Sequence, residues 1–292
     1  MRARYIDVLG GSIYATSGSV QEQATTAAIC ATKFYYESDD ESEINSPAAG
    51  TLANTIGIYL QVFDDSYNPQ GSCHITSGTL NINVANNSNE AFAYGIWGSD
   101  IVFGSSDDAS KTPTVNIDVA TGYDSVGIYD PMTKNLYSSQ VCFYGGEINI
   151  TTGVATGNNG YAVYAYNKNS INNCPVVFNG ATCVFKTSNS SEGNTDVVYT
   201  NCALQILDGD ISCSAGTNSE GDTGNSFTCT ESSKITFDKT QFNATNFYDF
   251  ENWQAGDAIV QKDANEPLQL VKKKVIVLTL DGEQTSKATT EG

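Results

Sequence analysis

The stretch "VCFYGGEINITT" at residues 141–152 decides the fold, because its pattern returns along the chain. Four segments align with it without gaps: "IDVLGGSIYATS" (6–17), "CHITSGTLNINV" (73–84), "VVFNGATCVFKT" (176–187) and "LQILDGDISCSA" (204–215). Copies with insertions lie at 33–46 and 101–119, and a degraded copy lies at 234–245. Such internal repetition indicates an architecture of units that stack on one another.

A second series, of small, aliphatic and aromatic residues, runs between these copies, for example "TIGIYLQ" (55–61), "AYGIWGS" (93–99) and "YDSVGIYDP" (123–131). Its third position falls at Cys30, Tyr59, Trp97, Tyr129, Tyr164, Tyr199 and Cys229. The anchor of the first series falls at Ile13, Ile44, Leu80, Val115, Ile148, Cys183, Ile211 and Phe242. Both series repeat about every 33 residues, so a single unit of three short strands recurs.

No amphipathic segment long enough for a crossover helix separates the strands, so each strand is expected to pair in parallel with its next copy. The sequence therefore predicts an all-β, single-stranded right-handed parallel β-helix of about seven coils, with three strands per coil. A β-propeller fits worse, since it needs about four strands in roughly 40–50 residues. Residues 1–250 would form this solenoid, and residues 251–292 a C-terminal cap strand with a truncated linker or the start of a further β-module.

Alternation of side chains along a strand assigns the faces of each unit. In "EINIT", Ile148 and Ile150 are expected to point inward. In "SVGIYD", Val126 and Ile128 would point inward, whereas Gly127 and Tyr129 would point outward.

An outward column of aromatic residues follows from this assignment, beside a flat strip of Ala28, Gly57, Gly95, Gly127 and Ala162. Tyr and Trp rings pack on the apolar faces of sugars while their polar tips reach hydroxyl groups. The candidate ligand-binding residues are therefore Tyr59, Trp97, Tyr129, Tyr164 and Tyr199. The alternative is a ladder of stacked rings that only shields the sheet.

The formal net charge of −19, with Arg2 and Arg4 as the only arginines, disfavours nucleic acid and anionic membranes as partners. It tolerates cations, and calcium prefers carboxylate and carbonyl oxygens. Calcium is the one cofactor that the sequence suggests, with solvated loops as the alternative. The candidate ligands lie in acidic loops: Asp39, Asp40, Asp64, Asp65, Asp107 and Asp108.

Eight cysteines without a CxxC pair, together with the single histidine His74, do not predict a structural zinc site. Cys174 and Cys202 occupy matching places one coil apart, which is compatible with a disulfide or with a ladder of thiols. Cys183 and Cys213 are expected in the core. No apolar run is long enough for membrane insertion, and no signal peptide is evident. Because the chain begins inside a repeat, we expect it to be a fragment without its export signal and anchor.

Catalytic patterns are poorly represented in this chain. Lyases of the β-helix fold use calcium with an essential basic residue, usually Arg, yet no Arg follows position 4. Hydrolases of the fold carry an Asn-Thr-Asp motif with further paired Asp, His-Gly and Arg-x-Lys, and here only "NTD" at 194–196 matches. The chain is therefore not predicted to be an enzyme, with a divergent polysaccharide lyase or hydrolase as the remaining enzymatic alternative.

The units "GGSIYATSG", "SGTLNINV", "GGEINITTG" and "VGIYD" resemble those of β-helix surface proteins of Firmicutes, over about residues 5–245. These are carbohydrate-binding domain-containing and adhesin-like β-helix proteins. The resemblance implies secretion and display at the cell surface, with calcium and plant-polysaccharide binding in some members. We therefore expect a non-enzymatic extracellular module of a bacterial protein, monomeric or part of a longer multidomain chain, that binds polysaccharide or host glycan or acts as an adhesin. A purely structural stalk is the alternative.

Overall fold

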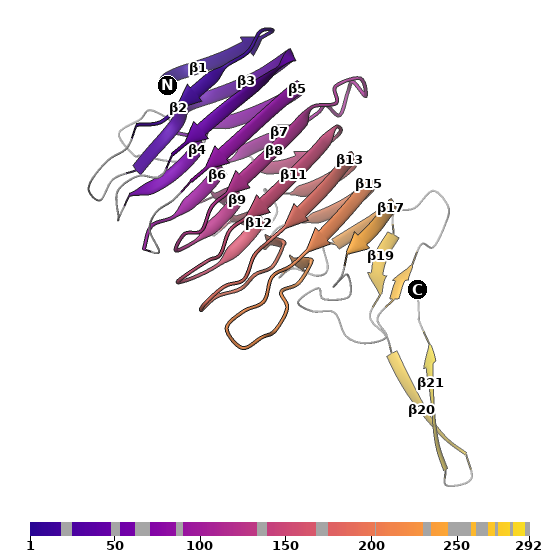
Figure 1. The fold of residues 1–292 in the computed structure, drawn as a ribbon. Coiled ribbons are helices and arrows are strands. Elements are labelled where there is room, and N and C mark those ends of the chain that lie inside the picture. Colours follow the sequence, from indigo (N-terminus) through magenta and orange to yellow (C-terminus); the bar gives the residue numbers. More distant parts are fainter. Residues whose placement is uncertain are drawn as a thin grey trace.

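A computed structural model of the protein describes residues 1–18, 25–47, 53–61, 71–85, 90–132, 139–167, 175–201, 203–229, 235–244, 258–260, 268–271, 274–280 and 283–289. Every regular element in these ranges is a β-strand, so the all-β prediction is confirmed (Figure 1). Within the same ranges, no helix is long and apolar enough to cross a membrane.

Most strands pair in parallel with a strand of the next repeat, and the pairings form three ladders. Ladder 1 contains β1 (Arg2–Leu9), β3 (Thr25–Ser46), β5 (Ser72–Val84), β7 (Asp100–Phe103), β10 (Gln140–Phe143), β13 (Val176–Lys186), β15 (Leu204–Ser214) and β17 (Ile235–Ala244). Ladder 2 contains β2 (Tyr14–Thr16), β8 (Thr114–Val119), β11 (Glu147–Thr152) and the C-terminal parts of β3, β5, β13, β15 and β17. Ladder 3 contains the N-terminal part of β3, then β4 (Asn54–Leu60), β6 (Ala93–Trp97), β9 (Ser125–Met132), β12 (Gly160–Asn167), β14 (Val198–Thr200) and β16 (Phe227–Cys229).

Successive copies therefore lie side by side, as the repeat predicts: Val141 pairs with Val176, and Ile148 pairs with Cys183. Strands β5 and β13 each run from ladder 1 into ladder 2. As a result, β5, β7, β10, β13, β11 and β8 form a closed circuit of parallel pairings, with the other strands outside it. Figure 1 shows the strands following one another in chain order from indigo to orange.

The interior is a single apolar cluster that collects the inward residues of all three ladders. Ile148 and Ile150 are fully buried in it, as predicted. Equivalent rings stack from one repeat to the next: the centroid of Phe143 lies 5.3 Å from that of Phe103 and 4.8 Å from that of Phe178. In-register parallel pairing places like side chains above one another, so a column of phenylalanines runs through the core.

Two positions predicted from the spacing are wrong, one in each series. Ser42, not Ile44, pairs with Leu80, because the acidic insertion in this repeat moves the register by two residues. Ser42 is fully buried, and its Oγ accepts a hydrogen bond from the Ile13 amide at 3.0 Å and lies 3.0 Å from the Tyr36 hydroxyl. At the other end Tyr199 pairs with Thr228 rather than with Cys229, which is fully buried in the core.

The prediction that Gly127 lies on an outward strip is also wrong. An added Cβ would lie 2.2 Å from Cγ2 of the core residue Ile150, so Gly127 faces the interior beside Ile128. Val126, predicted to be in the core, belongs instead to an apolar cluster outside it. The ladder pairs Val126 and Ile128 with residues of β12 but skips Gly127. Strict alternation therefore fails at Gly127.

The last strands change direction. β17 pairs antiparallel with β19 (Leu268–Val271), which pairs antiparallel with β18 (Ala258–Val260). β20 (Lys274–Leu280) and β21 (Glu283–Thr289) form a separate antiparallel hairpin. A strand laid antiparallel on the last parallel one is compatible with the predicted cap, and the boundary near residue 250 stays a prediction.

Candidate functional site

Aromatic side chains on the outer side of ladder 3 form a second apolar cluster, which we call the aromatic ridge. It comprises Ala27, Ile56, Tyr59, Phe92, Tyr94, Trp97, Val126, Tyr129, Tyr161, Tyr164 and Tyr199. All five predicted ligand-binding residues lie here, and each is partly exposed. The sequence analysis missed Tyr94 and Tyr161, although both precede a column residue by three positions, in "YGIW" and "YAVY".

Neighbouring rings of the ridge stack on one another. The Tyr94 and Tyr129 centroids lie 4.5 Å apart with planes 4° apart, and those of Tyr164 and Tyr199 lie 5.3 Å apart with planes 7° apart. Tyr129 and Tyr164 stack at 5.3 Å. Each of these rings covers a face of its neighbour, so ring edges and hydroxyl groups are what the middle of the ridge offers to solvent.

The ridge is uncharged at neutral pH. Burial raises the pKa of Tyr129 to about 12 and also raises the pKa of Tyr164. At its border, burial raises the pKa of Asp124, whose carboxylate accepts hydrogen bonds from the Tyr94 hydroxyl at 3.3 Å and the Asn159 amide at 3.1 Å. Asp124 thereby ties three successive repeats together where their ladder 3 strands begin.

A hollow of about 390 Å³ lies at the N-terminal end of the ridge. There Tyr59 pairs with Trp97 on one side, with ring centroids 5.0 Å apart, and with Cys30 on the other. The hollow is lined by Met1, Arg2, Thr25, Ala27, Cys30, Tyr59 and Gln61. Gln61 is a polar residue that is only 5% exposed.

The predicted calcium ligands that the structure describes come from two segments of the chain. Asp39 and Asp40 are exposed residues of β3, whereas Asp107 and Asp108 are exposed in the segment that follows β7. Asp64 and Asp65 lie outside the described residues. No group of three or more His, Cys, Asp or Glu side chains in the described ranges is arranged to hold a metal ion. Calcium binding stays a prediction.

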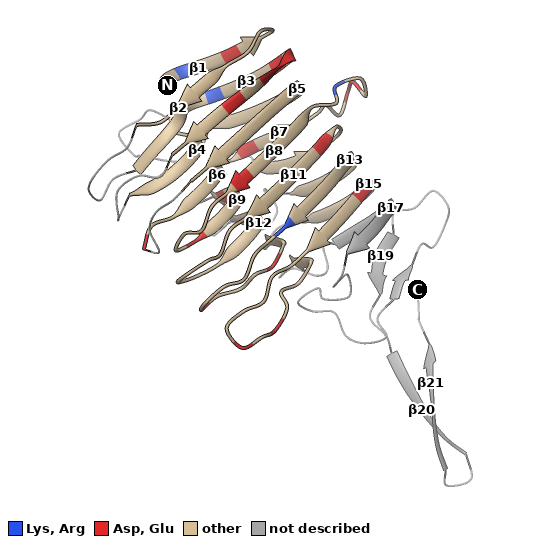
Figure 2. Cartoon of the chain, in the orientation of Figure 1, with Lys and Arg blue, Asp and Glu red and all other residues tan. Residues whose placement is uncertain are grey.

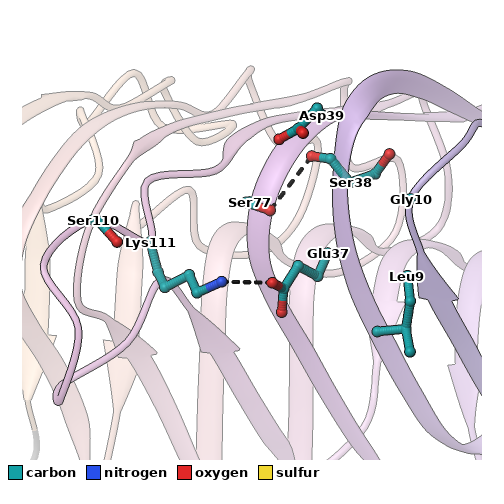
Figure 3. Close-up of a pocket in the computed structure, with 8 residues that line it drawn as sticks. All are labelled: Leu9, Gly10, Glu37, Ser38, Asp39, Ser77, Ser110 and Lys111. Carbon is teal, nitrogen blue, oxygen red and sulfur yellow. Dashed lines mark hydrogen bonds and ion pairs between the residues drawn. The ribbon is translucent and has the colours of Figure 1, made fainter.

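The segment after β7 lies over an edge of the molecule and encloses a second hollow, of about 440 Å³ (Figure 3). Lys111 Nζ lies 2.5 Å from an oxygen of Glu37, and the Tyr35 hydroxyl donates a 2.5 Å hydrogen bond to the other oxygen. Asp108 accepts hydrogen bonds from the amide and hydroxyl of Ser110, the residue before Lys111. The ion pair with Glu37 and the turn formed by Asp108 and Ser110 hold Lys111 over β3, which belongs to a unit two repeats earlier.

This ion pair predicts a pH dependence of stability. The Lys111 ammonium, and then the Tyr35 hydroxyl, lower the pKa of Glu37 below its ordinary value. A carboxyl with a lowered folded-state pKa stabilises the fold above its unfolded pKa of about 4.3, and this contribution disappears as the pH falls through the folded value. Between about pH 5 and pH 3, urea midpoints of the wild type should therefore fall further than those of Glu37→Gln.

Asp39→Asn, which neutralises an exposed carboxylate of the same hollow, is the control and should keep the wild-type profile. Parallel profiles for the wild type and Glu37→Gln would show that the Lys111 contact does not stabilise the fold.

A chain of amides crosses the outer face of ladder 2. Asn149 donates to Asn116 at 3.0 Å, Asn116 donates to Asn81 at 2.8 Å, and Asn81 donates to Glu41 at 2.7 Å. Beside it, the 73% exposed Tyr14 lines a polar hollow of about 360 Å³. The chain could have been found from the Asn that recurs in "LNIN", "VNID" and "INIT". It keeps this face polar and links four repeats.

The other residues considered in the sequence analysis, Asp196, His74 and the cysteines, contact neighbouring strands or lie in the core. Asp196 is 5% exposed, and its carboxylate accepts hydrogen bonds from the Asn225 amide at 2.7 Å and from the Thr228 hydroxyl at 2.8 Å. His74 Nε2 lies 3.0 Å from Asp100 on the neighbouring strand. The six cysteines of the described ranges are thiols rather than disulfides. Cys183 and Cys213 lie in the core as predicted, whereas Cys174 and Cys202 lie outside the described residues.

Charge and similarity give no more specific assignment. Figure 2 shows acidic residues spread over strands and turns with few basic residues among them. No protein-family model, curated protein or solved structure matches the chain. The aromatic ridge and its terminal hollow are therefore the basis for a functional proposal.

Proposed function

We propose that the parallel ladders form a single-stranded right-handed β-helix, and that this is a non-enzymatic module of a bacterial surface or secreted protein. Its function would be to bind carbohydrate through the aromatic ridge, on a polysaccharide or as an adhesin on a host glycan. The observation that carries this proposal is the gathering of partly exposed Tyr and Trp side chains into a cluster separate from the core. Aromatic clusters at a protein surface are typical of binding sites.

The electrostatics of the ridge support an uncharged polar ligand. The tyrosines of the ridge are neutral at physiological pH, since the ordinary pKa of tyrosine is about 10 and burial raises the pKa of Tyr129 and of Tyr164 further. Phenolic hydroxyls both donate and accept hydrogen bonds, as sugar hydroxyls do. Strongly acidic surroundings would repel polyanions at long range and leave neutral glycans unaffected.

Replacement of Trp97 tests the ridge. Trp97 contacts Tyr59, Tyr94 and Tyr129, with ring centroids 5.0, 5.3 and 5.5 Å away. We expect Trp97→Ala to weaken binding to an immobilised glycan panel by about tenfold or more, since central aromatic residues dominate binding energies. Tyr14→Ala, on the outer face of ladder 2, should bind as the wild type does. Wild-type affinity in both Trp97→Ala and Tyr129→Ala would remove the ridge as the binding surface.

A structural stalk is the alternative, favoured by the face-to-face stacking of Tyr94 on Tyr129 and of Tyr164 on Tyr199. Such rings would shield the sheet and bind nothing. The alternative predicts that Trp97 is protected from acrylamide quenching in a Trp253→Phe background, where Trp97 is the only tryptophan. Efficient quenching together with glycan binding would contradict the stalk.

A further inference from the structure

The structure carries an inference about where on the ridge a ligand binds, and it rests on the proposed function. We propose that the ridge holds one sugar ring in the hollow beside Tyr59, at its N-terminal end, rather than a glycan spread along its length. Three observations support this: the side of the Tyr59 ring that has no ring neighbour among the described residues, the volume and lining of the hollow, and the place of the Gln61 side chain in that lining.

The first observation is that Tyr129 has a neighbouring aromatic ring on each of its sides, whereas within the described part of the chain Tyr59 has one on a single side. Tyr129 stacks on Tyr94 at 4.5 Å and on Tyr164 at 5.3 Å, so other rings occupy both of its sides. Tyr59 has the Trp97 ring on one side, but its ladder neighbour on the other side is Cys30. Sugar rings pack on aromatic faces. Among the described residues, the face toward Cys30 is the one that this end of the ridge leaves without a ring.

The second observation is the hollow at that place. Its volume of about 390 Å³ lies within the range of roughly 300–1,000 Å³ that is usual for small-molecule sites. Tyr59 and Ala27 give it an apolar wall, and Thr25, Gln61 and Arg2 give it hydrogen-bonding groups. An apolar wall opposed by a few polar groups suits a pyranose, which has apolar faces and hydroxyls around its edge.

The third observation is the side chain of Gln61. Its backbone amide donates to Ala31 at 2.8 Å, and its backbone carbonyl accepts from the Thr32 hydroxyl at 2.9 Å. The residue is only 5% exposed, and its side chain lines the hollow together with Tyr59 and Thr25. A carboxamide offers two donors and an acceptor, which match two adjacent sugar hydroxyls.

Cys30→Phe is the sharpest test. It adds a ring where the stack ends, so it should cover the free side of Tyr59 and fill the hollow while leaving the core unchanged. We expect binding to an immobilised panel that includes cellohexaose and hexagalacturonate to fall at least about tenfold, as expected when a central contact is lost. Binding of the neutral or of the acidic probe tells whether Arg2 selects a carboxylate.

Single substitutions at the two ends of the ridge provide the comparison. Tyr59→Ala should lose glycan binding as Cys30→Phe does, whereas Tyr59→Phe should retain it. Gln61→Leu should weaken glycan binding about fivefold to tenfold, because its hydrogen bonds to the sugar are lost. Tyr199→Ala, at the far end, should bind within about twofold of the wild type, because it is remote from the contact. Thermal unfolding of each variant checks that it is folded. If Tyr59→Ala does not fold, the binding of Gln61→Leu decides whether the terminal site is correct.

The outcomes separate the two proposals. A wild-type protein that binds no glycan of the panel would overturn both. Glycan binding that Tyr199→Ala abolishes but Cys30→Phe and Gln61→Leu leave intact would retain the ridge and overturn the terminal site.

Discussion

Gly127→Val is expected to lower the free energy of unfolding by about 3 kcal/mol, the upper part of the range for overpacked interiors. A Cβ on Gly127 would lie 2.2 Å from Ile150 Cγ2 and 2.6 Å from the Ala162 carbonyl oxygen. Neither neighbour can withdraw easily, because Ile150 is fully buried and Ala162 belongs to the adjacent backbone. Urea unfolding of the wild type and the variant, followed by circular dichroism, measures the difference.

Gly160→Ala is the matched control, since a Cβ there meets nothing closer than 3.6 Å. It should change stability by less than about 1 kcal/mol, because alanine also restricts the unfolded chain. Equal losses of stability in Gly127→Val and Gly160→Ala would contradict the view that close packing against Ile150 requires a glycine at position 127. The additional replacement Ile150→Ala should relieve part of the Gly127→Val loss, because it removes the atom nearest the new side chain.

The parallel pairing of copies could be predicted from sequence because repetition fixes which strands are equivalent. Ile148 and Cys183 lie in one column in the structure, as their spacing indicates. Alternation failed at Gly127, since a two-residue period holds only in regular pairing and the pairing with β12 skips this residue. Spacing failed at Ile44, because an insertion inside a repeat does not reveal which residues remain paired. Periodicity thus predicts the ladders well, but it does not predict where the pairing skips a residue or shifts its register.

In the candidate site, too, the repeated residues could be predicted from the sequence and the residues at its irregular end could not. The column from Tyr59 to Tyr199 was evident from the repeat, because each member occupies the same place in its unit. The hollow beside Tyr59 was not evident, since it depends on Cys30, the one member of that part of the column without a ring. Gln61 carried no signal, because its burial and its place beside the hollow follow from the packing of neighbouring repeats. A break in the repeat, not the repeat itself, produces the hollow beside Tyr59.

The second large effect is expected in the phenylalanine column of the core. Phe143 is fully buried, and its ring stacks 5.3 Å from Phe103 and 4.8 Å from Phe178, with Phe185 at 5.5 Å. Phe143→Ala should lower the free energy of unfolding by about 4 kcal/mol, because it removes buried apolar surface and leaves a cavity. Rings above and below belong to rigid parallel ladders, which limits how far the cavity can collapse.

Phe143→Leu should lose much less stability than Phe143→Ala, because it fills most of the space while removing the stacked ring. Tyr14→Ala, which removes a ring that is 73% exposed, is the surface control and should change stability by less than about 0.5 kcal/mol. Chemical denaturation of all three variants separates the contributions of volume and of ring stacking. A loss below about 1 kcal/mol in Phe143→Ala would contradict a continuous core, since a column that supports several repeats cannot lose a central ring at so small a cost.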